Sequence, residues 1–283
     1  MNKRIFWKFF GCFTGILVLL IAAIAIFLVP FNGFNNTMQL ESLDQYTGGR
    51  KNVLVMGTDE SGLRSDVIMI ASFSPDGGAI NVTSVPRDTR VTIGGRNQKI
   101  NAALSIGGEE MAVQTIKEAT GIPIHDFMKV NFNAVKQIVD KVGGVEFDVP
   151  QDMDYEDPAQ DLYIHLKAGV QTLNGDQAVQ LLRFRKYPMA DIQRTKVQRD
   201  FMHAAFEQKA KPRYIFKIPA ILNANDKNMV ASITSKEALE YVFMVKNKSS
   251  EGFNSLEIPY YLSNPYVVIK PDEMAAMVNE YFK

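Results

Sequence analysis

The sequence has very little cysteine and histidine, with Cys12, His125, His165 and His203 the only such residues in 283. A lone cysteine cannot form an intrachain disulfide, and none of the histidines belongs to an HExxH-type pair. A disulfide framework is therefore excluded and a zinc hydrolase is disfavoured. The patterns GxxxxGK(S/T), GxSxG and SxxK are also absent. Their absence removes the usual sequence evidence for a P-loop NTPase, an α/β-hydrolase or a penicillin-binding enzyme.

An excess of charge of one sign is missing too, because 31 Lys and Arg face 31 Asp and Glu. Residues 1–30 contain Lys3, Arg4 and Lys8 and no acid, so the remaining 253 residues carry 28 basic and 31 acidic side chains, a net charge of −3. A polycationic surface that binds nucleic acid through counterion release is therefore not expected.

The longest apolar run, Phe9–Pro30, contains no charge and has about the length that a helix needs to cross a bilayer. Basic residues precede it, whereas the first charge after it is Glu41. The positive-inside rule then places residues 1–8 in the cytoplasm and everything beyond the run outside the cell. The alternative is a cleaved signal peptide, since Ala23–Ala25 resembles a processing site, although the apolar run continues to Val29.

Beyond this run the sequence predicts a polar stalk over residues 31–45 and one extracellular domain over 46–283, which no repeat or low-complexity segment divides. Runs rich in β-formers alternate with amphipathic helical patterns that end at glycines. The predicted strands are 52–56, 67–73, 80–85, 127–132, 145–149 and one near 256–261, and the predicted helices are 109–119, 134–142, 174–182, 191–208, segments after 212, and 272–282. This alternation indicates an α/β domain around a central sheet.

The first cluster of polar residues comprises Asp59, Arg64 and Asp66, which bracket one short loop before a predicted strand. Carboxylate oxygens are ligands for hard divalent cations, and a guanidinium binds phosphate oxygens. The cluster therefore suggests a combined metal and phosphate site. The alternative is an Asx-turn beside a surface ion pair, since turns favour Asp and surface pairs are common.

The second cluster, Arg87, Asp88 and Arg90, follows a strand of almost entirely apolar or small residues, where α/β folds place their ligands. The two arginines face one anion if the turn curls. Otherwise the segment is a solvated loop in which Asp88 pairs with one of them. Lys99 adds a further cation, unless this segment is simply a helix start with Asn101 as its N-cap.

The third cluster, Arg183–Arg199, has six basic residues and one acid, Asp191, which gives +5 over seventeen residues in a domain with negative net charge. In an extended Arg183-Phe184-Arg185 both guanidiniums point to one side, and Arg194 and Gln198 stand one turn apart on the following helix. A solvated basic helix is the alternative. The spacing instead fits an anion held from two elements.

Arginine rather than lysine predominates in these clusters. Its planar fork binds phosphate oxygens bidentately and stays charged at physiological pH. Acids and arginines from three segments therefore describe a site for a metal ion and a substrate that carries two or more phosphates.

Four stretches stand in order behind the apolar run: NVLVMGTDESGLRSDVIMIASF, INVTSVPRDTRV, QKINAALSIGG and GVQTLNGDQAVQLLRFRKYPMADIQRTKVQRDF. Together they resemble the LytR-CpsA-Psr family across the whole predicted extracellular domain. The resemblance implies an α/β/α arrangement around a mixed central sheet, with an apolar pocket for a lipid tail. It also implies a membrane-anchored enzyme that moves a glycopolymer, such as wall teichoic acid or capsular polysaccharide, from a polyprenyl-pyrophosphate carrier to peptidoglycan.

Carried over residue by residue, the resemblance makes Asp59 and Asp66 the ligands of Mg²⁺, with Mn²⁺ as the alternative ion. The implied pyrophosphate ligands are Arg64, Arg87, Arg183, Arg185, Arg194 and Gln198. Matching motif positions with less defined roles are Asp88, Arg90, Lys99, Asn101, Asp191 and Arg199. The residues offered to the lipid tail are Ile116, Val130, Phe132, Ile138 and Val142, with ordinary core packing as the alternative.

The expected reaction is a phosphotransfer outside the membrane. An acceptor hydroxyl, by family precedent the muramic acid C6-OH, attacks the phosphoryl group on the glycan, and polyprenyl phosphate leaves. Arg64, Arg87 and the metal ion neutralise the charge, and either Asp66 or Asp88 takes the hydroxyl proton. Two alternatives remain: hydrolysis of the lipid pyrophosphate at the same site, and a non-catalytic binder or regulator of envelope polymers.

The charge pattern around the apolar run gives the first testable prediction. Protease added to intact protoplasts should degrade the domain beyond residue 30, because the positive-inside rule exports it. Immunoblotting against the domain measures the loss. A protected domain would contradict this orientation, and a mature N-terminus after Ala25 would establish the signal peptide instead.

Overall fold

The structure is a computed structural model that describes residues 38–58, 62–158, 162–188, 190–209, 228–234 and 253–283, together with Glu237, Glu240, Tyr241 and Met244. The predicted cytoplasmic segment, the membrane helix at 9–30 and stalk residues 31–37 lie outside the described residues, as do residues 210–227. Within the described ranges, no helix combines the length and the apolar composition needed to cross a bilayer.

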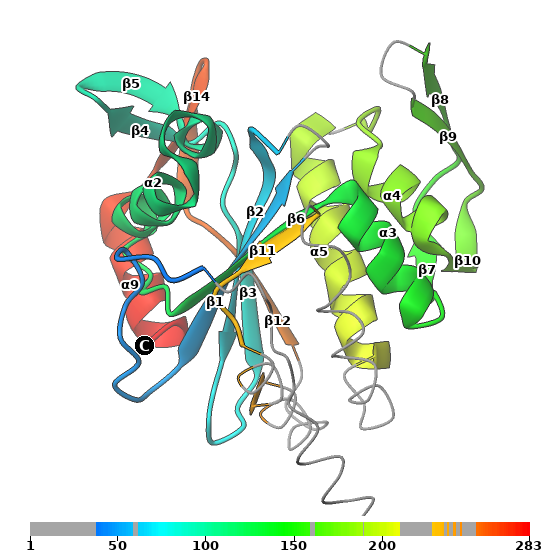
Figure 1. The fold of residues 1–283 in the computed structure, drawn as a ribbon. Helices are drawn as coiled ribbons and strands as arrows, with labels where there is room; N and C mark the ends of the chain where they lie inside the picture. Colours follow the sequence, from blue (N-terminus) through cyan, green and yellow to red (C-terminus); the bar gives the residue numbers. More distant parts are fainter. Residues whose placement is uncertain are drawn as a thin grey trace, which may run out of the picture.

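A six-stranded mixed sheet in the order β11-β6-β1-β2-β3-β12 forms the centre of the fold (Figure 1). Its strands are β1 (Lys51–Thr58), β2 (Ser65–Phe73), β3 (Ile80–Ser84), β6 (Asp126–Asn131), β11 (Met229–Ala231) and β12 (Phe253–Glu257). β1 is parallel to β6 and antiparallel to β2, whereas β3 is antiparallel to β2 and parallel to β12. The prediction of an α/β domain with a mixed central sheet is confirmed.

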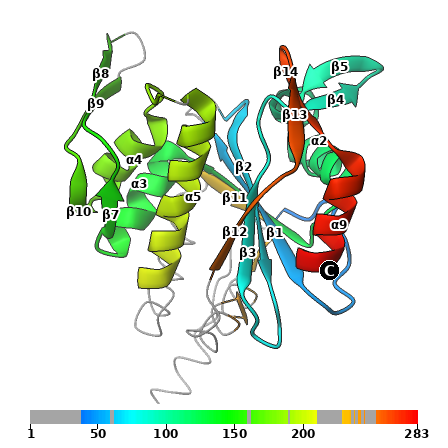
Figure 2. The ribbon, with the colours of Figure 1, turned by 180° about the vertical axis from the view of Figure 1, so that it is seen from behind.

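Helices cover both faces of this sheet (Figures 1 and 2). One face carries α2 (Ala103–Thr120) and α9 (Pro271–Tyr281), and the other carries α3 (Phe132–Lys141), α4 (Gly175–Arg183) and α5 (Ala190–Lys209). Successive side chains of a strand point to opposite faces. Leu54 and Met56 of β1 therefore join the core that contains α2 and α9, whereas Val53 joins the core on the other face.

The terminal helix α9 is tied to two strands of the sheet. Asn52 Nδ2 in β1 donates to the carbonyl oxygen of Phe282 at 2.9 Å, and Asn81 Nδ2 in β3 donates to that of Tyr281 at 2.7 Å. The ring of Phe282 is completely buried in the same core as Leu54. Side-chain amides thus satisfy carbonyl groups that the end of a helix leaves without intrahelical partners.

Four two-stranded pairs accompany the central sheet in the described residues. They are β4 (Arg90–Ile93) with β5 (Arg96–Lys99), β7 (Val145–Val149) with β10 (Gly169–Leu173), β8 (Met153–Asp157) with β9 (Leu162–Leu166), and β13 (Tyr260–Ser263) with β14 (Tyr266–Ile269). The sequence predicted β7 as a separate strand. It predicted one strand near 256–261, which the structure divides at Ile258-Pro259, because proline cannot donate to a ladder.

The start of α2 also differs from expectation. The helix begins at Ala103 rather than at 109, and Gly107 and Gly108 interrupt it with φ values of −142° and 67°. A 3₁₀ turn, η1 (Ile100–Ala102), precedes it with Lys99 in the N-cap position. The alternative that made Asn101 an N-cap is therefore wrong.

Residues 38–45, which the sequence places in the stalk, pack against the domain. Leu40 and Ser42 are buried, and the Ser42 N–H donates to Glu110 Oε1 of α2 at 2.7 Å. Asp44 accepts from Ile124 N at 2.9 Å. The packed part of the chain therefore includes residues predicted as stalk.

α3 and α4 approach each other closely at Gly175, the first residue of α4. A Cβ atom at this position would lie 2.3 Å from the carbonyl oxygen of Lys136 in α3. The Gly175 N–H donates to Asp140 Oδ1 at 2.7 Å, and Asn174 caps the helix. This contact sets the position of α4, whose last residue is Arg183.

Gly175→Ala should lower the free energy of unfolding by about 1–3 kcal/mol, because the added methyl group overpacks a contact with backbone. Urea denaturation followed by circular dichroism measures the change. Val170→Ala, at a site in β10 that is 70% exposed, is the control and should stay within about 0.5 kcal/mol. An unchanged midpoint for Gly175→Ala would show that the two helices separate at little cost.

Candidate active site

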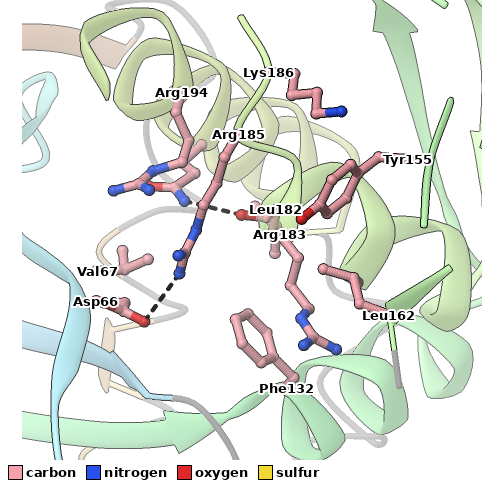
Figure 3. A pocket seen from close by; sticks show the side chains of 11 residues that line it. Asp66, Val67, Phe132, Tyr155, Leu162, Leu182, Arg183, Arg185, Lys186 and Arg194 are labelled. Atoms are coloured by element: carbon pink, nitrogen blue, oxygen red, sulfur yellow. Dashed lines mark hydrogen bonds and ion pairs between the residues drawn. The ribbon is translucent and has the colours of Figure 1, made fainter. Parts of the chain in front are cut away.

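A cleft lies where β2 begins and α4 ends (Figure 3). Its cavity of about 160 Å³ is smaller than the roughly 300–1,000 Å³ of pockets that enclose a drug-sized ligand. The lining residues are Asp66, Val67, Phe132, Tyr155, Leu162, Leu182, Arg183, Arg185, Lys186, Arg194 and Gln198. They include one acid and four basic side chains. The cavity therefore suits a small, negatively charged group.

Asp66 joins arginines from two other segments. Its Oδ1 accepts a hydrogen bond from Arg87 Nη1 at 2.7 Å, and its Oδ2 lies 3.5 Å from Arg185 Nη2 (Figure 3 shows the second contact). The Asp66 side chain is 22% exposed, whereas that of Arg185 is 57% exposed. The carboxylate therefore orients both guanidiniums, and Arg185 keeps most of its surface for a ligand.

The turn that carries Arg87 is held by its own hydrogen bonds. The carbonyl oxygen of Pro86 accepts from Thr89 N at 2.9 Å and from Thr89 Oγ1 at 2.6 Å. The carbonyl oxygen of Arg87 accepts from Asn101 N at 3.3 Å. Asn101 therefore supports the backbone of Arg87 through its own main chain.

Arg183 and Arg185 flank a buried phenylalanine. Arg183 ends α4, and Phe184, the C-cap residue, has extended backbone angles of φ −64° and ψ 132°. Because residues i and i+2 of an extended segment point to one side, the burial of Phe184 turns both guanidiniums toward the cavity. The structure thus brings together the two arginines whose spacing indicated a common side.

α5 contributes Arg194 and Gln198, one turn apart and both buried. Gln198 Nε2 donates to the carbonyl oxygen of Leu182 in α4 at 3.1 Å, which joins the two helices beside the cavity. Arg194 lies close enough to Tyr187 to act on its ionisation. The amide and the guanidinium are therefore fixed parts of the cavity wall.

Two cation–π contacts complete the wall. The Arg183 guanidinium lies 5.3 Å from the ring centre of Phe132, and Lys186 Nζ lies 4.5 Å from that of Tyr155. Both pairs line the cavity (Figure 3). Such contacts hold a cation without neutralising it, so both charges remain available to an anion.

Tyr187 is buried next to this wall, with its ring 4.9 Å edge-on from that of Phe184. Burial raises the pKa of Tyr187 to about 12, while the charge of Arg194 acts in the opposite direction. The phenol therefore stays protonated at physiological pH and cannot serve there as a proton acceptor.

Several residues expected in the site lie outside the cavity lining of the described chain. Arg64 is exposed in the loop before β2. Asp88 pairs with Lys99 at 2.9 Å, and Lys99 lies opposite Arg90 in the β4–β5 pair. Arg90 and Lys99 thus belong to the β4–β5 hairpin, and Asp88 immediately precedes it. Arg87 is also absent from the described lining, although it contacts Asp66, which lines the cavity.

The remaining predicted polar residues divide into two groups. Arg199 Nε donates to Ser255 Oγ of β12 at 3.1 Å, so this arginine points away from the cavity. Asp59 and the side chain of Asp191 lie outside the described residues.

Of the five residues offered to the lipid tail, Phe132 lines the described cavity. Ile116 is completely buried in the core beneath α2, on the other face of the sheet. Val130 packs with Met229 and Ala231. The structure does not bring Ile116 and Val130 to the cavity, because helical or strand periodicity predicts burial without saying which face is buried.

Ile138 and Val142 also lie outside the cavity lining of the described chain. Ile138 is in α3 and Val142 is its buried C-cap residue. Five further residues line the cavity although the sequence did not indicate them: Val67, Tyr155, Leu162, Leu182 and Lys186. Among these five residues, only Lys186 had a signal in the sequence, namely its charge within the basic third cluster.

Within the described part of the chain, no group of three or more Asp, Glu, His or Cys side chains is arranged to hold a metal ion. Asp66 is the one carboxylate that lines the described cavity. Mg²⁺ usually binds through one or two carboxylates together with substrate phosphates and water. The donor set fits such an ion when a phosphate ligand is present.

The mixed α/β fold thus carries a cleft in which a carboxylate orients arginines from separate segments. Residues 32–282 match the model of the LytR_cpsA_psr family, and the chain belongs to this family.

The chain is similar to polyisoprenyl-teichoic acid--peptidoglycan teichoic acid transferases. It is 31% identical to TagV of Bacillus subtilis over 201 residues, which cover 69% of this chain and 51% of TagV. It is 34% identical to TagU of Bacillus mycoides over 212 residues, which cover 73% of this chain and 67% of TagU. The matches thus span from about half to two thirds of these relatives.

Solved structures show the same fold. The crystal structure of B. subtilis TagV matches with a TM-score of 0.71 and 27% identity, over 84% of this chain and 98% of that chain. A structure of TagT bound to LI-WTA matches with a TM-score of 0.68 and 21% identity, over 86% of this chain and 94% of that chain. At that identity the second likeness concerns the fold alone.

Arg87→Lys and Arg185→Lys should each weaken the binding of inorganic pyrophosphate by about tenfold or more, because a lysine lacks the planar fork. Titration calorimetry measures the affinity, and thermal unfolding checks the fold. Arg199→Lys is the matched control, since Arg199 contacts Ser255 instead of the cavity. Equal affinities for all three variants would remove the arginines from the binding site.

Proposed function

We propose that this protein is a membrane-anchored extracellular phosphotransferase. It moves a glycopolymer of the teichoic acid or capsular type from a polyprenyl-pyrophosphate carrier to peptidoglycan and forms a phosphodiester. The observation that carries the proposal is the cavity in which Asp66 braces arginines from separate segments, within the fold of this family. The names of TagU and TagV support the same reaction.

The size of the cavity indicates that only one part of the proposed substrate enters it. About 160 Å³ accommodates a charged head group, while the glycan and the prenyl chain extend beyond it. Arg183, Arg185 and Arg194 then surround the diphosphate. The positive charges of these arginines repel one another, and a diphosphate placed between them relieves this repulsion. The relief of repulsion favours binding of the diphosphate.

The reaction forms a bond from the acceptor hydroxyl oxygen to the phosphorus atom that bears the glycan, and breaks the bond from that phosphorus to the bridging oxygen. Polyprenyl phosphate leaves with the bridging oxygen. Arg87 and Arg185 neutralise charge on the oxygens of the phosphoryl group, which supplies most of the stabilisation that phosphoryl transfer requires.

The two carboxylates considered for the proton differ in position. Asp66 lines the cavity, whereas Asp88 is paired with Lys99 outside the lining of the described cavity. A proton acceptor has to come within hydrogen-bond reach of the hydroxyl. This geometry favours Asp66 as the group that receives the proton.

The proposed metal ion is Mg²⁺, with Mn²⁺ as the alternative. Asp66 is its proposed ligand in the described cavity, and Asp59 is the second ligand implied by the family resemblance. When bound, such an ion neutralises charge on phosphate oxygens as a Lewis acid.

Asp66→Asn should lower turnover about a hundredfold or more, because the change is nearly isosteric but removes the charge that braces the arginines. The assay combines the full chain, a synthetic lipid-pyrophosphate glycan, a peptidoglycan oligomer and Mg²⁺, and mass spectrometry detects the phosphodiester product. The matched control is Asp200→Asn, since Asp200 pairs with Lys196 on the exposed side of α5.

The products of this assay also separate the alternatives. Release of glycan phosphate without a peptidoglycan adduct would make the protein a hydrolase. Retention of unchanged donor would make it a binding protein. Full activity in the presence of a chelator would exclude the metal ion from the reaction.

A further inference from the structure

The ribbon formed by β13 and β14 exposes large apolar side chains. Tyr261 is 51% exposed and Leu262 is 71% exposed. Because neighbouring residues of a strand point to opposite faces, each face of the ribbon presents one of them. Figures 1 and 2 show the ribbon beside the β4–β5 hairpin, beyond the central sheet. Exposed apolar groups gathered on one projecting element mark a surface for interaction.

The ribbon is rooted on the turn that carries Arg87. Val267 N donates to the carbonyl oxygen of Asp88 at 3.0 Å, and Val267 forms a parallel bridge with Thr89. Leu262 is the partner of Val267 in the ribbon. With strands about 4.8 Å apart, Leu262 lies roughly 10 Å from Thr89. The exposed apolar surface is thus coupled to the turn whose Arg87 contacts Asp66 in the cavity lining.

The hairpin beside the ribbon is basic. Residues 90–99 contain Arg90, Arg96 and Lys99 and no acid. Lys99 pairs with Asp88 just before the hairpin, and Lys270 at the end of the ribbon pairs with Glu273. Arg90 and Arg96 therefore carry the surplus positive charge of this surface. Arg90 and Arg96 are exposed. Tyr266 Oη donates to the carbonyl oxygen of Asn97 at 3.3 Å and so joins the ribbon to this hairpin.

We infer that the β13–β14 ribbon and the β4–β5 hairpin form a docking surface for an anionic lipid bilayer. The exposed end of the ribbon inserts at the interface, so that Tyr261 and Leu262 on its two faces both contact lipid, and the hairpin lies on the head groups. Apolar and aromatic side chains flanked by basic ones have the composition of interfacial membrane-binding segments. The exposed charges of Arg90 and Arg96 complement the negative surface of such a bilayer.

This inference rests on the proposed function, which supplies the reason for such a surface. A prenyl-linked donor reaches the protein from the bilayer, where its diphosphate lies at the level of the head groups. Interfacial segments bury their apolar face about 5–10 Å into the boundary of the acyl chains. Insertion of Leu262 would therefore bring the turn with Arg87 to the level of the diphosphate.

Site-directed spin labelling tests the docking directly. The full chain with Cys12→Ser and Leu262→Cys is labelled with a nitroxide and reconstituted into vesicles of phosphatidylglycerol and phosphatidylcholine. The matched control carries Val170→Cys, because Val170 is 70% exposed and lies in β10, across the central sheet from the ribbon (Figure 1). Collision rates with oxygen and with a water-soluble nickel chelate report the depth of each label.

The expected result is a higher ratio of oxygen to nickel collisions at position 262 than at position 170. Arg96→Gln should lower the ratio of inserted to aqueous label at position 262 about fivefold. This is the change expected when one basic residue is removed from a surface that binds an anionic membrane. Equal nickel access at 262 and 170 would overturn the inference. A dipolar coupling between labels at 262, together with aqueous access, would assign the surface to a second copy instead.

These outcomes are independent of turnover. An aqueous label on a chain that forms the phosphodiester would reject membrane docking and leave the proposed function intact. A label immersed in the bilayer, on a chain that forms no phosphodiester, would support membrane docking and reject the proposed function.

Discussion

The cleft depends on the electrostatic constraint that Asp66 imposes. Guanidiniums brought close together repel one another unless an anion lies between them. Asp66 supplies this anion to Arg87 and Arg185, which come from different segments of the chain. The surrounding backbone is fixed independently, by the turn at Pro86–Thr89 and by the close contact at Gly175. The protein has therefore met the cost of orienting these cations before a phosphate arrives, which is the arrangement that electrostatic catalysis requires.

The parts of the fold that could be predicted are those with a long and unambiguous pattern. β1, β2 and β3 consist largely of β-forming residues, and α4 and α5 are bounded by turn residues, so their existence follows from local chemistry. The hairpin strands β5, RNQK, and β8, MDYED, contain few β-forming residues, unlike the equally short β3 and β7, which were predicted. Each of these strands pairs with its neighbour in the chain, so local composition and not distance hid them.

The arginines of the site could be predicted because their density contrasts with a domain of negative net charge. Their grouping was harder to predict, since Arg90 and Lys99 sit on a hairpin that was itself not expected. Tyr155 reaches the cavity through the β8–β9 pair, and nothing in its neighbours along the chain indicates this. Ile116 shows the same limit for apolar residues, because a mixed sheet has two buried faces and periodicity does not distinguish them.

The attachment of α9 to β1 and β3 affects the order in which the protein takes shape during synthesis. The carbonyl groups that accept from Asn52 and Asn81 belong to Phe282 and Tyr281, far along the chain. A ribosome delivers them only after every other described element has been made. Until then the apolar side of the sheet that α9 covers stays open, and a nascent chain in this state is prone to aggregation. The face that α9 covers is therefore complete only after residues 271–282 have been made, and a chain cut short before α9 would keep it exposed to quality-control proteases.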